Sequence, residues 1–398
     1  MDRALILTPA GLSGELSYSP AEDYRFRYGI GATQDLQISL TMPIRDSSYT
    51  SRALHPVFQM NLPEGYVLEQ LRNRLAKSTP INPMLLMALA GSGSPIGRVR
   101  VEAPSLDEWL QRAPQPSGER LDELLAWDGA QDLFASLLDK YILRSGISGV
   151  QPKLIVPEQV SPDSKVKVLT PELIVKTGRD DFPGLAINEF VCMDAARRAG
   201  IAVPEFFLSD NRRLFVMRRF DRAADQRPLG FEDMAVLTGL GTEDKYNSSY
   251  EKIARVLRLF CAPTLLKGSL EQLFDMVALS CMVGNGDGHL KNFGLLYEDP
   301  LGADARLAPA YDIVNTTAYL PEDSLALSLA GSKSLFRSRL GILDFAQSCE
   351  IRDAKARLRR LIEAVEESLA VNRPLAPSAP HVFEAIAHAQ GLFAQTFR

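Results

Sequence analysis

The sequence predicts an α+β protein, with strands concentrated in its first half and helices in its second. Short alternating runs of apolar and polar residues, separated by glycine and proline turns, extend from Ala4 to about Gly65. The period of two returns between Lys153 and Met217. Beyond Asp221 the strand signal becomes weak and apolar residues recur at helical spacing. We therefore expect a mixed N-terminal part and a mainly helical C-terminal part.

Length and charge narrow the possible functions. With 398 residues, the chain can form two or three domains with a substantial core, which excludes disorder and a mini-protein scaffold. Its 44 Lys and Arg residues against 49 Asp and Glu residues give a net charge of −5. Bulk charge therefore does not attract the chain to nucleic acid, and any contact with a polyanion would need a local patch.

The sequence shows no membrane or zinc signature. No apolar run reaches the ~20 residues that a membrane-spanning helix needs, and the N-terminal segment does not resemble a signal peptide. The four cysteines and four histidines are scattered, without the paired spacing of a zinc site or a disulfide framework. We expect a cytoplasmic protein without membrane association, whose cysteines are buried and reduced.

The first region, residues 1–103, is expected to be a small β-rich subdomain. Strands are predicted at residues 5–7, 16–18, 24–28 and 36–40, in an antiparallel sheet. The segment Asn61-Leu62-Pro63-Glu64-Gly65 then opens an amphipathic stretch through Leu75, and a short helix is predicted at residues 83–89. Proline, serine and charged residues from about Pro104 to Gly118 indicate a domain boundary or a surface excursion.

Residues 119–220 are expected to form a second unit and residues 221–398 a third. In the second, a helix near residues 121–138 precedes strands at 153–156, 173–176 and 214–217, and a further helix runs from Ala186 to Ala199 and ends at Gly200. In the third, helices are predicted at residues 233–240, 250–260, 270–283, 355–369 and 381–397.

A loop of small residues from Ser145 to Lys153 is the first candidate for function. Its centre, Ser148-Gly149-Val150-Gln151, runs into the strand predicted at 153–156. Glycine lacks the Cβ that would keep backbone N–H groups away from a phosphate, so such a loop can bind one. Taken alone the pattern is weak, because most glycine-serine loops before strands are plain turns.

Lys176 is the second candidate, because it ends an apolar strand where its ammonium group needs an anion beside it. Glu189 follows 13 residues later on the next predicted helix. The two could pair as the strand lysine and helix glutamate of a kinase do. Equally, both side chains could be solvated at the surface.

The segment from Gly284 to Phe293 carries the most specific pattern. Asp287 and Asn292 stand five residues apart, the spacing between the catalytic aspartate and the magnesium-binding asparagine of protein kinases. A carboxylate can accept the proton of an attacking hydroxyl while a nearby amide oxygen holds Mg²⁺. Lys291, between them, could offset charge on the transferring phosphoryl group. The alternatives are a tight turn with solvated tips, or a calcium loop that lacks the spaced ligands of an EF-hand.

Asp312 is the only acid among the apolar residues 307–314. A buried carboxylate is costly without a cation or hydrogen-bond donors, so this residue is either a cap or a metal ligand. It follows Asn292 by 20 residues, which suits a second magnesium ligand. Loop, lysine, aspartate–asparagine pair and late aspartate thus occur in the order found in kinases.

Together these segments resemble the HipA family of bacterial serine/threonine kinase toxins, over nearly the whole chain. The resemblance is carried by Gly284–Phe293, Tyr311–Ile313, Phe220–Arg222 and Ser148–Lys153. Residues 38–43 and 61–65 are similar to that family's small N-terminal subdomain. The resemblance implies a two-lobed HipA-like kinase fold, with ATP between a mixed α/β N-terminal lobe and a helical C-terminal lobe.

The resemblance also implies roles for individual residues. Asp287 would be the catalytic base, and Asn292 and Asp312 would hold Mg²⁺. The residues implied to bind ATP are Ser148, Gly149, Val150, Gln151, Lys153, Lys176, Met217, Arg218, Phe220, His289, Lys291, Asn292, Tyr311 and Asp312. Family members often have an acid at the position of Arg218, so backbone contact with the adenine is expected there.

Regulation and partners are likewise implied by the family. Members phosphorylate a serine of the glycine loop, for which Ser148 is in register. Gly146 stands where related chains can carry a second serine, and Ser145 is one position off, so self-regulation could be altered or lost. The implied substrate is a protein such as an aminoacyl-tRNA synthetase. The implied partner is a helix-turn-helix antitoxin of the HipB type, which would be the only link to DNA.

The sequence leaves an arginine cluster and two other functions open. Arg212, Arg213, Arg218, Arg219 and Arg222 could touch a phosphate or an acidic partner, or form a solvated basic edge. A small-molecule phosphotransferase would share the kinase spacing, but such enzymes usually have a histidine just before the catalytic aspartate, where this chain has glycine. A catalytically inactive, nucleotide-binding partner of a helix-turn-helix repressor is the other alternative, although the predicted site is intact.

Overall fold

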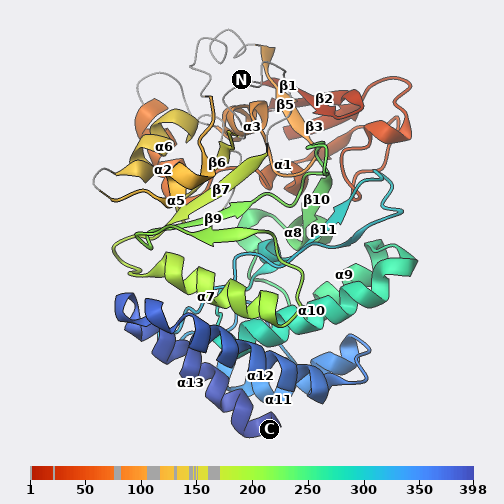
Figure 1. Ribbon diagram of the computed structural model, residues 1–398. Coiled ribbons are helices and arrows are strands. Elements are labelled where there is room, and N and C mark those ends of the chain that lie inside the picture. The colour runs from red at the N-terminus through yellow and green to blue at the C-terminus, as the bar shows by residue number, and fades with distance from the viewer. Residues whose placement is uncertain are drawn as a thin grey trace.

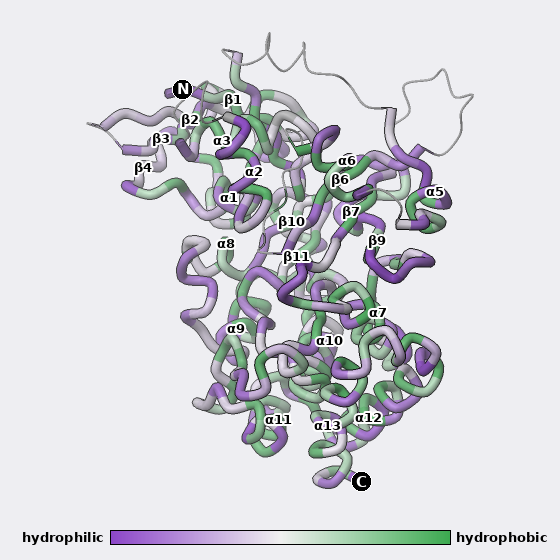
Figure 2. The backbone as a smooth tube through the Cα atoms, turned by 90° about the vertical axis from the view of Figure 1, so that its left-hand side faces the viewer, coloured by the Kyte–Doolittle hydropathy of each residue, from purple (hydrophilic) through white to green (hydrophobic). Residues whose placement is uncertain are grey.

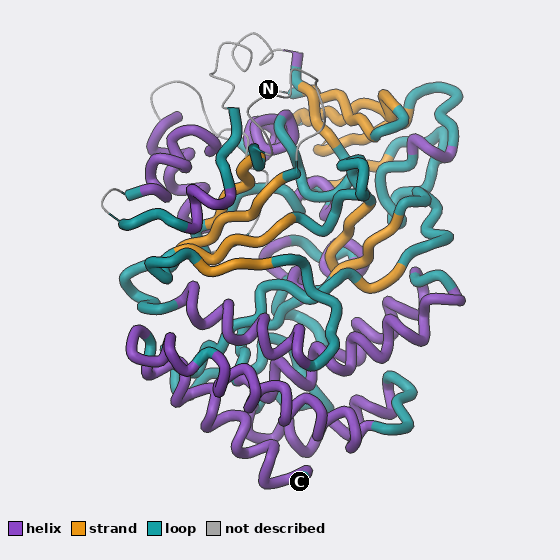
Figure 3. Tube along the Cα trace, in the orientation of Figure 1, coloured by secondary structure: helices purple, strands orange, loops and turns teal. Residues whose placement is uncertain are grey.

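The computed structural model describes residues 2–20, 23–75, 82–104, 117–129, 132–142, 147, 149, 151–159 and 171–398. Strands gather in one half of the molecule and long helices fill the other, at the end opposite the N-terminus (Figure 1, Figure 3). The α+β class and the mainly helical C-terminal lobe are confirmed. Most of the expected linker, residues 105–116, lies outside the described residues, and the domain boundaries stay predictions.

The N-terminal subdomain is built on a five-stranded antiparallel sheet. Ile6, Leu16 and Phe26 alternate with more exposed neighbours and are buried, which explains why the sequence predicts this sheet. The last strand has only three residues, too few for a recognisable period, and the sequence does not predict it. The strands are β1 (Arg3–Thr8), β2 (Gly11–Ser19), β3 (Asp23–Tyr28), β4 (Tyr49–Ser51) and β5 (Arg100–Glu102), in the order β4-β3-β2-β1-β5.

The strand predicted at residues 36–40 is wrong. A 3-10 turn, η1 (Gln34–Leu36), begins this segment, and the residues after it join no strand. The Ser39 hydroxyl and the Leu40 N–H instead donate to the carboxylate of Glu232, at 2.6 and 2.8 Å. The apolar alternation therefore reflects a loop buried against the C-terminal lobe.

Three helices complete this subdomain: α1 (Pro56–Gln59), α2 (Gly65–Leu75) and α3 (Pro83–Ser92). The last two agree with the helical stretches that the sequence predicts. The side chain of Asn82 accepts the N–H of Leu85 at 2.9 Å, and proline occupies the first helical position, so local capping fixes the start of α3.

A four-stranded antiparallel sheet forms the centre of the molecule. Its strands are β6 (Lys153–Pro157), β7 (Glu172–Thr177), β8 (Phe206–Leu208) and β9 (Leu214–Arg218), in the order β6-β7-β9-β8. Helix α7 (Leu185–Arg198) packs on one face of this sheet and also against α12 of the C-terminal lobe. The other face packs against α6 (Leu133–Tyr141).

The alternation of side chains along β6 and β7 explains these two cores. Ile155 and Ile174 pack with α7, whereas Leu154 and Val175 pack with α6. The single helix predicted near residues 121–138 is instead two, α5 (Leu121–Leu125) and α6. The side chain of Asp132 accepts the N–H of Ala135 at 3.0 Å and starts the second helix afresh.

The C-terminal lobe combines a small sheet with long helices. Apolar and polar residues recur along each of its long helices in Figure 2, as expected for helices with one face in the core. The sheet has the order β10 (Gly230–Asp233), β11 (Gly294–Tyr297), β12 (Arg306–Leu307). The helices are α8 (Met234–Thr238), α9 (Tyr250–Phe260), α10 (Pro263–Val283), α11 (Leu335–Ser348), α12 (Ala354–Val371) and α13 (Pro380–Phe397), with 3-10 turns η3 (Thr242–Asp244), η4 (Leu290–Asn292) and η5 (Arg373–Ser378).

Two of these helices differ from the prediction. α10 begins at Pro263 instead of residue 270, because a proline at the first helical position is a favourable start. α11 was missed because arginines and a central glycine interrupt its apolar period. Among the described residues, no helix is both long and apolar enough to cross a membrane. All four cysteines are buried and unpaired, as expected.

A buried ion network fixes the segment that joins the two lobes. Arg219 donates to the carboxylate of Asp221 at 2.9 and 2.6 Å, and to that of Glu172 at 2.9 Å. Arg222 reaches the same two carboxylates at 3.0 and 3.3 Å. The Arg219 side chain is 0% exposed and that of Arg222 9%. Arg219 and Arg222 are therefore structural residues, and neither contacts a phosphate or an acidic partner or belongs to a solvated basic edge.

The same network ties in the N-terminal subdomain. The carboxylate of Asp221 accepts the backbone N–H of Gly97 at 2.7 Å. Burial alone would raise the pKa of Asp221, but the guanidinium groups of Arg219 and Arg222 lower it below its usual value. Asp221 is therefore a buried anion shared by three parts of the chain.

Asp221→Ala is expected to lower the free energy of unfolding by about 3–5 kcal/mol, because it leaves two buried guanidinium groups without their main counter-charge. Urea unfolding followed by circular dichroism measures this loss. Glu298→Ala is the matched control, since its pair with Arg227 joins side chains that are 51 and 45% exposed. Its removal is expected to cost less than about 1 kcal/mol. Equal losses in both variants would contradict a structural role for the network.

Candidate active site

A cavity of about 460 Å³ lies between the central sheet and the C-terminal lobe. Both lobes contribute to its wall. Lys153 and Lys176 come from β6 and β7, and Asp287, Asn292 and Asp312 come from two loops of the C-terminal lobe. The structure therefore brings together motifs that lie far apart in the sequence.

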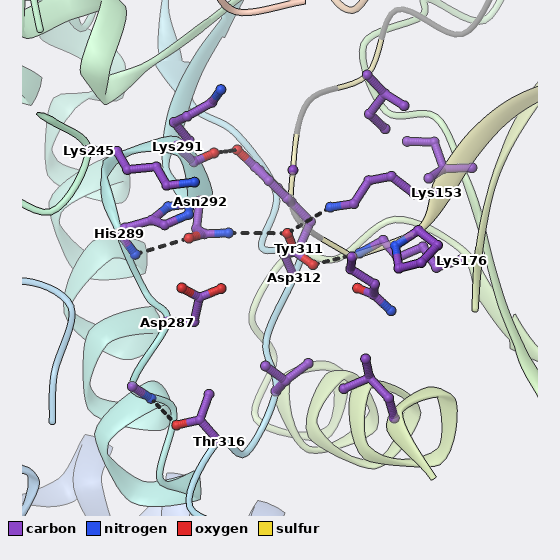
Figure 4. A pocket seen from close by; sticks show the side chains of 18 of the residues that line it. Lys153, Lys176, Lys245, Asp287, His289, Lys291, Asn292, Tyr311, Asp312 and Thr316 are labelled. Atoms are coloured by element: carbon purple, nitrogen blue, oxygen red, sulfur yellow. Dashed lines mark hydrogen bonds and ion pairs between the residues drawn. The ribbon is translucent and has the colours of Figure 1, made fainter. Parts of the chain in front are cut away.

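Asp312 is held by two lysines from the opposite lobe (Figure 4). Lys153 and Lys176 stand directly opposite each other in the β6–β7 register. Their ammonium groups reach the Asp312 carboxylate at 3.2 and 2.8 Å. Lys176 also contacts Glu189 on α7 at 2.5 Å, so the lysine–glutamate pair that the sequence suggested is confirmed, and the solvated alternative is wrong.

Burial and charge act against each other in this cluster. Burial alone would lower the pKa of Lys176, but the carboxylates of Asp312 and Glu189 outweigh it and raise that pKa. Burial alone would raise the pKa of Asp312, but the two ammonium groups hold it well below its usual range. Asp312 is therefore an anion at the cavity wall, with its charge neutralised by the lysines.

The two C-terminal motifs are joined by direct hydrogen bonds. The side-chain amide of Asn292 donates to Asp312 at 3.3 Å, and the hydroxyl of Tyr311 donates to the backbone carbonyl of Lys291 at 2.7 Å. The Asn292 oxygen accepts the backbone N–H of His289 at 3.0 Å. Burial lowers the pKa of His289 to about 3, so this ring is neutral.

The loop after α10 carries Asp287. Its backbone N–H donates to the side chain of Asn285 at 2.9 Å, which orients the loop. Its carboxylate faces the cavity, and burial followed by repulsion from Asp312 raises its pKa to about 6. The hydroxyl of Tyr246 donates to this carboxylate at 3.0 Å. Asp287 thus combines access from the cavity with a carboxylate that accepts a proton near neutral pH.

The donor set fits a magnesium ion. The Asp312 carboxylate and the Asn292 side-chain amide lie side by side, and both groups carry hard oxygen atoms, which Mg²⁺ prefers as ligands. The nitrogen of the Asn292 amide faces Asp312 and its oxygen accepts the His289 N–H, so the amide would have to turn to bind the ion. The described residues contain no cluster of three or more His, Cys, Asp or Glu side chains that could hold a metal by themselves. A site of one carboxylate and one amide suits Mg²⁺, which is usually held by one or two carboxylates together with substrate phosphates.

Glu64, from the N-terminal subdomain, reaches this loop and was not assigned a role from the sequence. Its carboxylate contacts Lys291 at 2.6 Å and Lys245 at 3.2 Å. In Figure 4 the Lys291 ammonium points away from Asp287. The family-like segment at residues 61–65 was the only sequence signal for this contact.

Apolar side chains form one end of the cavity. Met217 and Phe220 lie there with Ile174, and the rings of Phe220 and Tyr311 are 5.3 Å apart. Arg218, between Met217 and Phe220, does not line the cavity. Its guanidinium group contacts Glu158 at 2.6 Å instead, so its side chain is not a nucleotide contact in this structure.

The glycine loop is only partly within the described residues. Gly149 and Gln151 line the cavity, whereas Ser148 and Val150 lie outside the described residues. Gly149 has φ of +134°, and a Cβ there would lie 2.7 Å from the Lys153 ammonium nitrogen. Glycine at this position therefore leaves space for the lysine.

A sheet lobe with a buried lysine–glutamate pair, facing a helical lobe with an aspartate–asparagine loop and a late aspartate, defines the class of two-lobed kinases. Comparison with known proteins places the chain more closely. The family model HipA-like C-terminal domain matches residues 145–371, and the model HipA N-terminal domain matches residues 4–102. The chain therefore belongs to the HipA family, as its motifs indicated.

Individual relatives agree with this assignment. Two proteins of Sinorhizobium fredii, Y4dM and Y4mE, carry the word kinase in their names. Y4dM is 29% identical over 303 residues, 70% of this chain and 67% of its own. Y4mE is 27% identical over 334 residues, 77% of this chain and 75% of its own.

A solved structure agrees in fold. The toxin–antitoxin complex of HipA, HipB and operator DNA from Shewanella oneidensis MR-1 contains a chain that matches with a TM-score of 0.68. The match has 20% sequence identity and covers 98% of this chain and 97% of that one. The two-lobed HipA-like architecture is thus shared over nearly the full length.

Gly286→Ala is expected to lower the free energy of unfolding by about 1–3 kcal/mol, since a Cβ there would lie 2.7 Å from the Ser324 carbonyl oxygen and 2.0 Å from the Asp323 carboxylate. Gly268→Ala is the matched control. It lies inside α10 with nothing within 4 Å of the added carbon, and is expected to stabilise by about 0.5–1 kcal/mol. Thermal and urea unfolding measure both, and stabilisation by Gly286→Ala would contradict the packing of this loop.

Proposed function

We propose that this chain is an ATP- and Mg²⁺-dependent serine/threonine protein kinase of the HipA type. The observation that carries the proposal is the convergence of three distant motifs around one cavity: Lys176 with Glu189, Asp287 with Asn292, and Asp312. Each motif supplies a part that phosphoryl transfer requires, namely a phosphate-binding cation, a base and a metal ligand.

Asp287 is proposed as the catalytic base. It would accept the proton of a substrate hydroxyl while that oxygen attacks the γ-phosphorus of ATP and the bond to the β-phosphate oxygen breaks. A pKa of about 6 keeps this carboxylate mostly ionised at pH 7, yet makes it a better proton acceptor than an ordinary aspartate.

Asn292 and Asp312 would hold the metal through one amide oxygen and one carboxylate. When bound, Mg²⁺ supplies positive charge to the oxygens of the transferring phosphoryl group. The phosphates of ATP would then replace Asp312 as the anionic partners of Lys153 and Lys176. Because both lysines are already oriented and desolvated, little further ordering is needed for this exchange.

The apolar end of the cavity would take the adenine. Met217 and Phe220 offer apolar and aromatic surface there, beside Tyr311. The ion pair of Arg218 with Glu158 turns its side chain outward, so recognition of the adenine amino group would fall to the backbone of this segment.

The proposal also includes a partner protein and a protein target. A helix-turn-helix antitoxin of the HipB type is supported as partner by the Shewanella assembly, which contains HipA, HipB and operator DNA. Contact with DNA would pass through that partner, in agreement with a net charge of −5. A cytoplasmic protein substrate such as an aminoacyl-tRNA synthetase, and self-phosphorylation at Ser148, rest on family resemblance alone.

Asp287→Asn is expected to abolish phosphoryl transfer, by about 1,000-fold or more, while ATP still binds, because only the proton acceptor and its charge are lost. Incubation with labelled ATP and Mg²⁺ measures transfer, and equilibrium binding of ATP measures affinity. Phosphopeptide mapping on cells that express each form would identify targets and test Ser148. Asp344→Asn, on the exposed side of α11, is the matched control and should match the parent. Parental transfer by Asp287→Asn would refute the assigned base.

The pH dependence of kcat/KM for ATP should show an acidic limb. Burial and Asp312 raise the pKa of Asp287, so its carboxylate becomes protonated, and unable to act as a base, as the pH falls through about 6. Initial rates between about pH 3.5 and pH 8 test this. A limb near pH 4, the ordinary aspartate range, or a flat profile would contradict the assignment.

A further inference from the structure

The contact of Tyr246 with Asp287 indicates a second function for the mouth of the cavity. Tyr246 lies two residues after η3, in the connection between α8 and α9. Its hydroxyl donates to a carboxylate oxygen of Asp287 at 3.0 Å, and its ring lines the cavity. Tyr246 could not be predicted from the sequence, because nothing in its neighbourhood resembles a motif.

The hydrogen bond from Tyr246 to Asp287 has the geometry expected for a substrate hydroxyl bound to the base. A general base has to lie within about 2.6–3.2 Å of the hydroxyl oxygen whose proton it accepts. A tyrosine hydroxyl and a serine or threonine hydroxyl are the same kind of donor. The lone pair of Asp287 that accepts the proton of Tyr246 is therefore unavailable to an incoming hydroxyl.

We propose that Tyr246 is a built-in competitor for the acceptor site, whose hydroxyl takes the place of the hydroxyl to be phosphorylated and withdraws when a protein substrate enters. This inference rests on the proposed kinase function and adds to it a residue that controls access to the base. While Tyr246 is in place, it also occupies, in place of a water molecule, the Asp287 oxygen to which it donates, which limits hydrolysis of bound ATP.

The surroundings of Tyr246 permit such a movement. Tyr246 is 38% exposed, and its ring meets the ring of His289 edge-on, with centroids 5.1 Å apart. The preceding residue is fixed: the ammonium of Lys245 contacts Glu64 at 3.2 Å, and its carbonyl accepts the N–H of Leu290 at 3.2 Å. Rotation of one side chain about χ1 would therefore clear the acceptor site without moving the anchored backbone.

Tyr246→Phe tests the proposal, because it removes the hydroxyl and keeps the ring. The full chain is incubated with Mg²⁺ and ATP alone, without protein substrate, and the steady-state release of ADP is measured. We expect Tyr246→Phe to raise this rate about fivefold, the effect of losing one ordinary hydrogen bond that competes with water. The double variant Tyr246→Phe, Asp287→Asn should show no gain, because the additional turnover has to pass through the base.

The matched control is Tyr49→Phe, which removes a hydroxyl bonded to the Pro43 carbonyl in the N-terminal subdomain; Tyr49 is not among the residues that line the cavity. It should release ADP at the parental rate. An unchanged rate of ADP release in Tyr246→Phe would contradict the proposal that Tyr246 is a competitor. A slower rate would also contradict it, and would indicate that Tyr246 positions Asp287. Absence of label transfer by the parent in the assay with labelled ATP and Mg²⁺ would instead overturn the proposed kinase function, and this inference with it.

Discussion

The pairing of Asp312 with two lysines is the interaction on which the meeting of the lobes depends. Lys153 and Lys176 belong to adjacent strands of one lobe, and Asp312 belongs to a loop of the other. Their side chains are 7, 3 and 23% exposed. Burial of an unpaired ion costs several kcal/mol. Lys176 also pairs with Glu189 of its own lobe, but Lys153 takes its anion from the other lobe. Charge neutralisation across the cavity therefore stabilises the contact between the lobes. It also holds the ammonium groups of Lys153 and Lys176 in an orientation in which they can bind phosphates.

The N-terminal subdomain is also joined to the C-terminal lobe by charge neutralisation. Glu64 provides the counter-charge for Lys245 and Lys291, which face the cavity from the C-terminal lobe. Glu232, in turn, receives the Ser39 hydroxyl and the Tyr297 hydroxyl, each at 2.6 Å. Buried charges and polar groups are thus completed across boundaries between parts of the chain. The subdomain consequently contributes Met60 and Ile96 to the cavity wall and, through Glu64, the counter-charge of two lysines that line it.

These long-range partners also mark the limit of what the sequence could predict. The Lys176–Glu189 pair was foreseeable because strand and helix periods fix its two members locally, 13 residues apart. The spacing of Asp287 and Asn292 is equally local. Glu64 lies 227 residues from Lys291, and no period relates the two. The strand predicted at 36–40 failed for the same reason, since burial by a distant lobe imitates the alternation of a sheet edge.

The backbone of Asp312 shows why this position carries an aspartate. Its φ of +59° lies in the left-handed region, which costs a non-glycine residue about 1–3 kcal/mol. Asparagine and aspartate tolerate this region best, because their short polar side chains bond locally. Asparagine would leave Lys153 without an anion and Lys176 with Glu189 alone, and glutamate would add strain and length. Tyr311, the residue before Asp312, is anchored by the hydrogen bond of its hydroxyl to the Lys291 carbonyl. Only aspartate satisfies both the backbone and the two lysines, so strain and charge together select one side chain at the centre of the site.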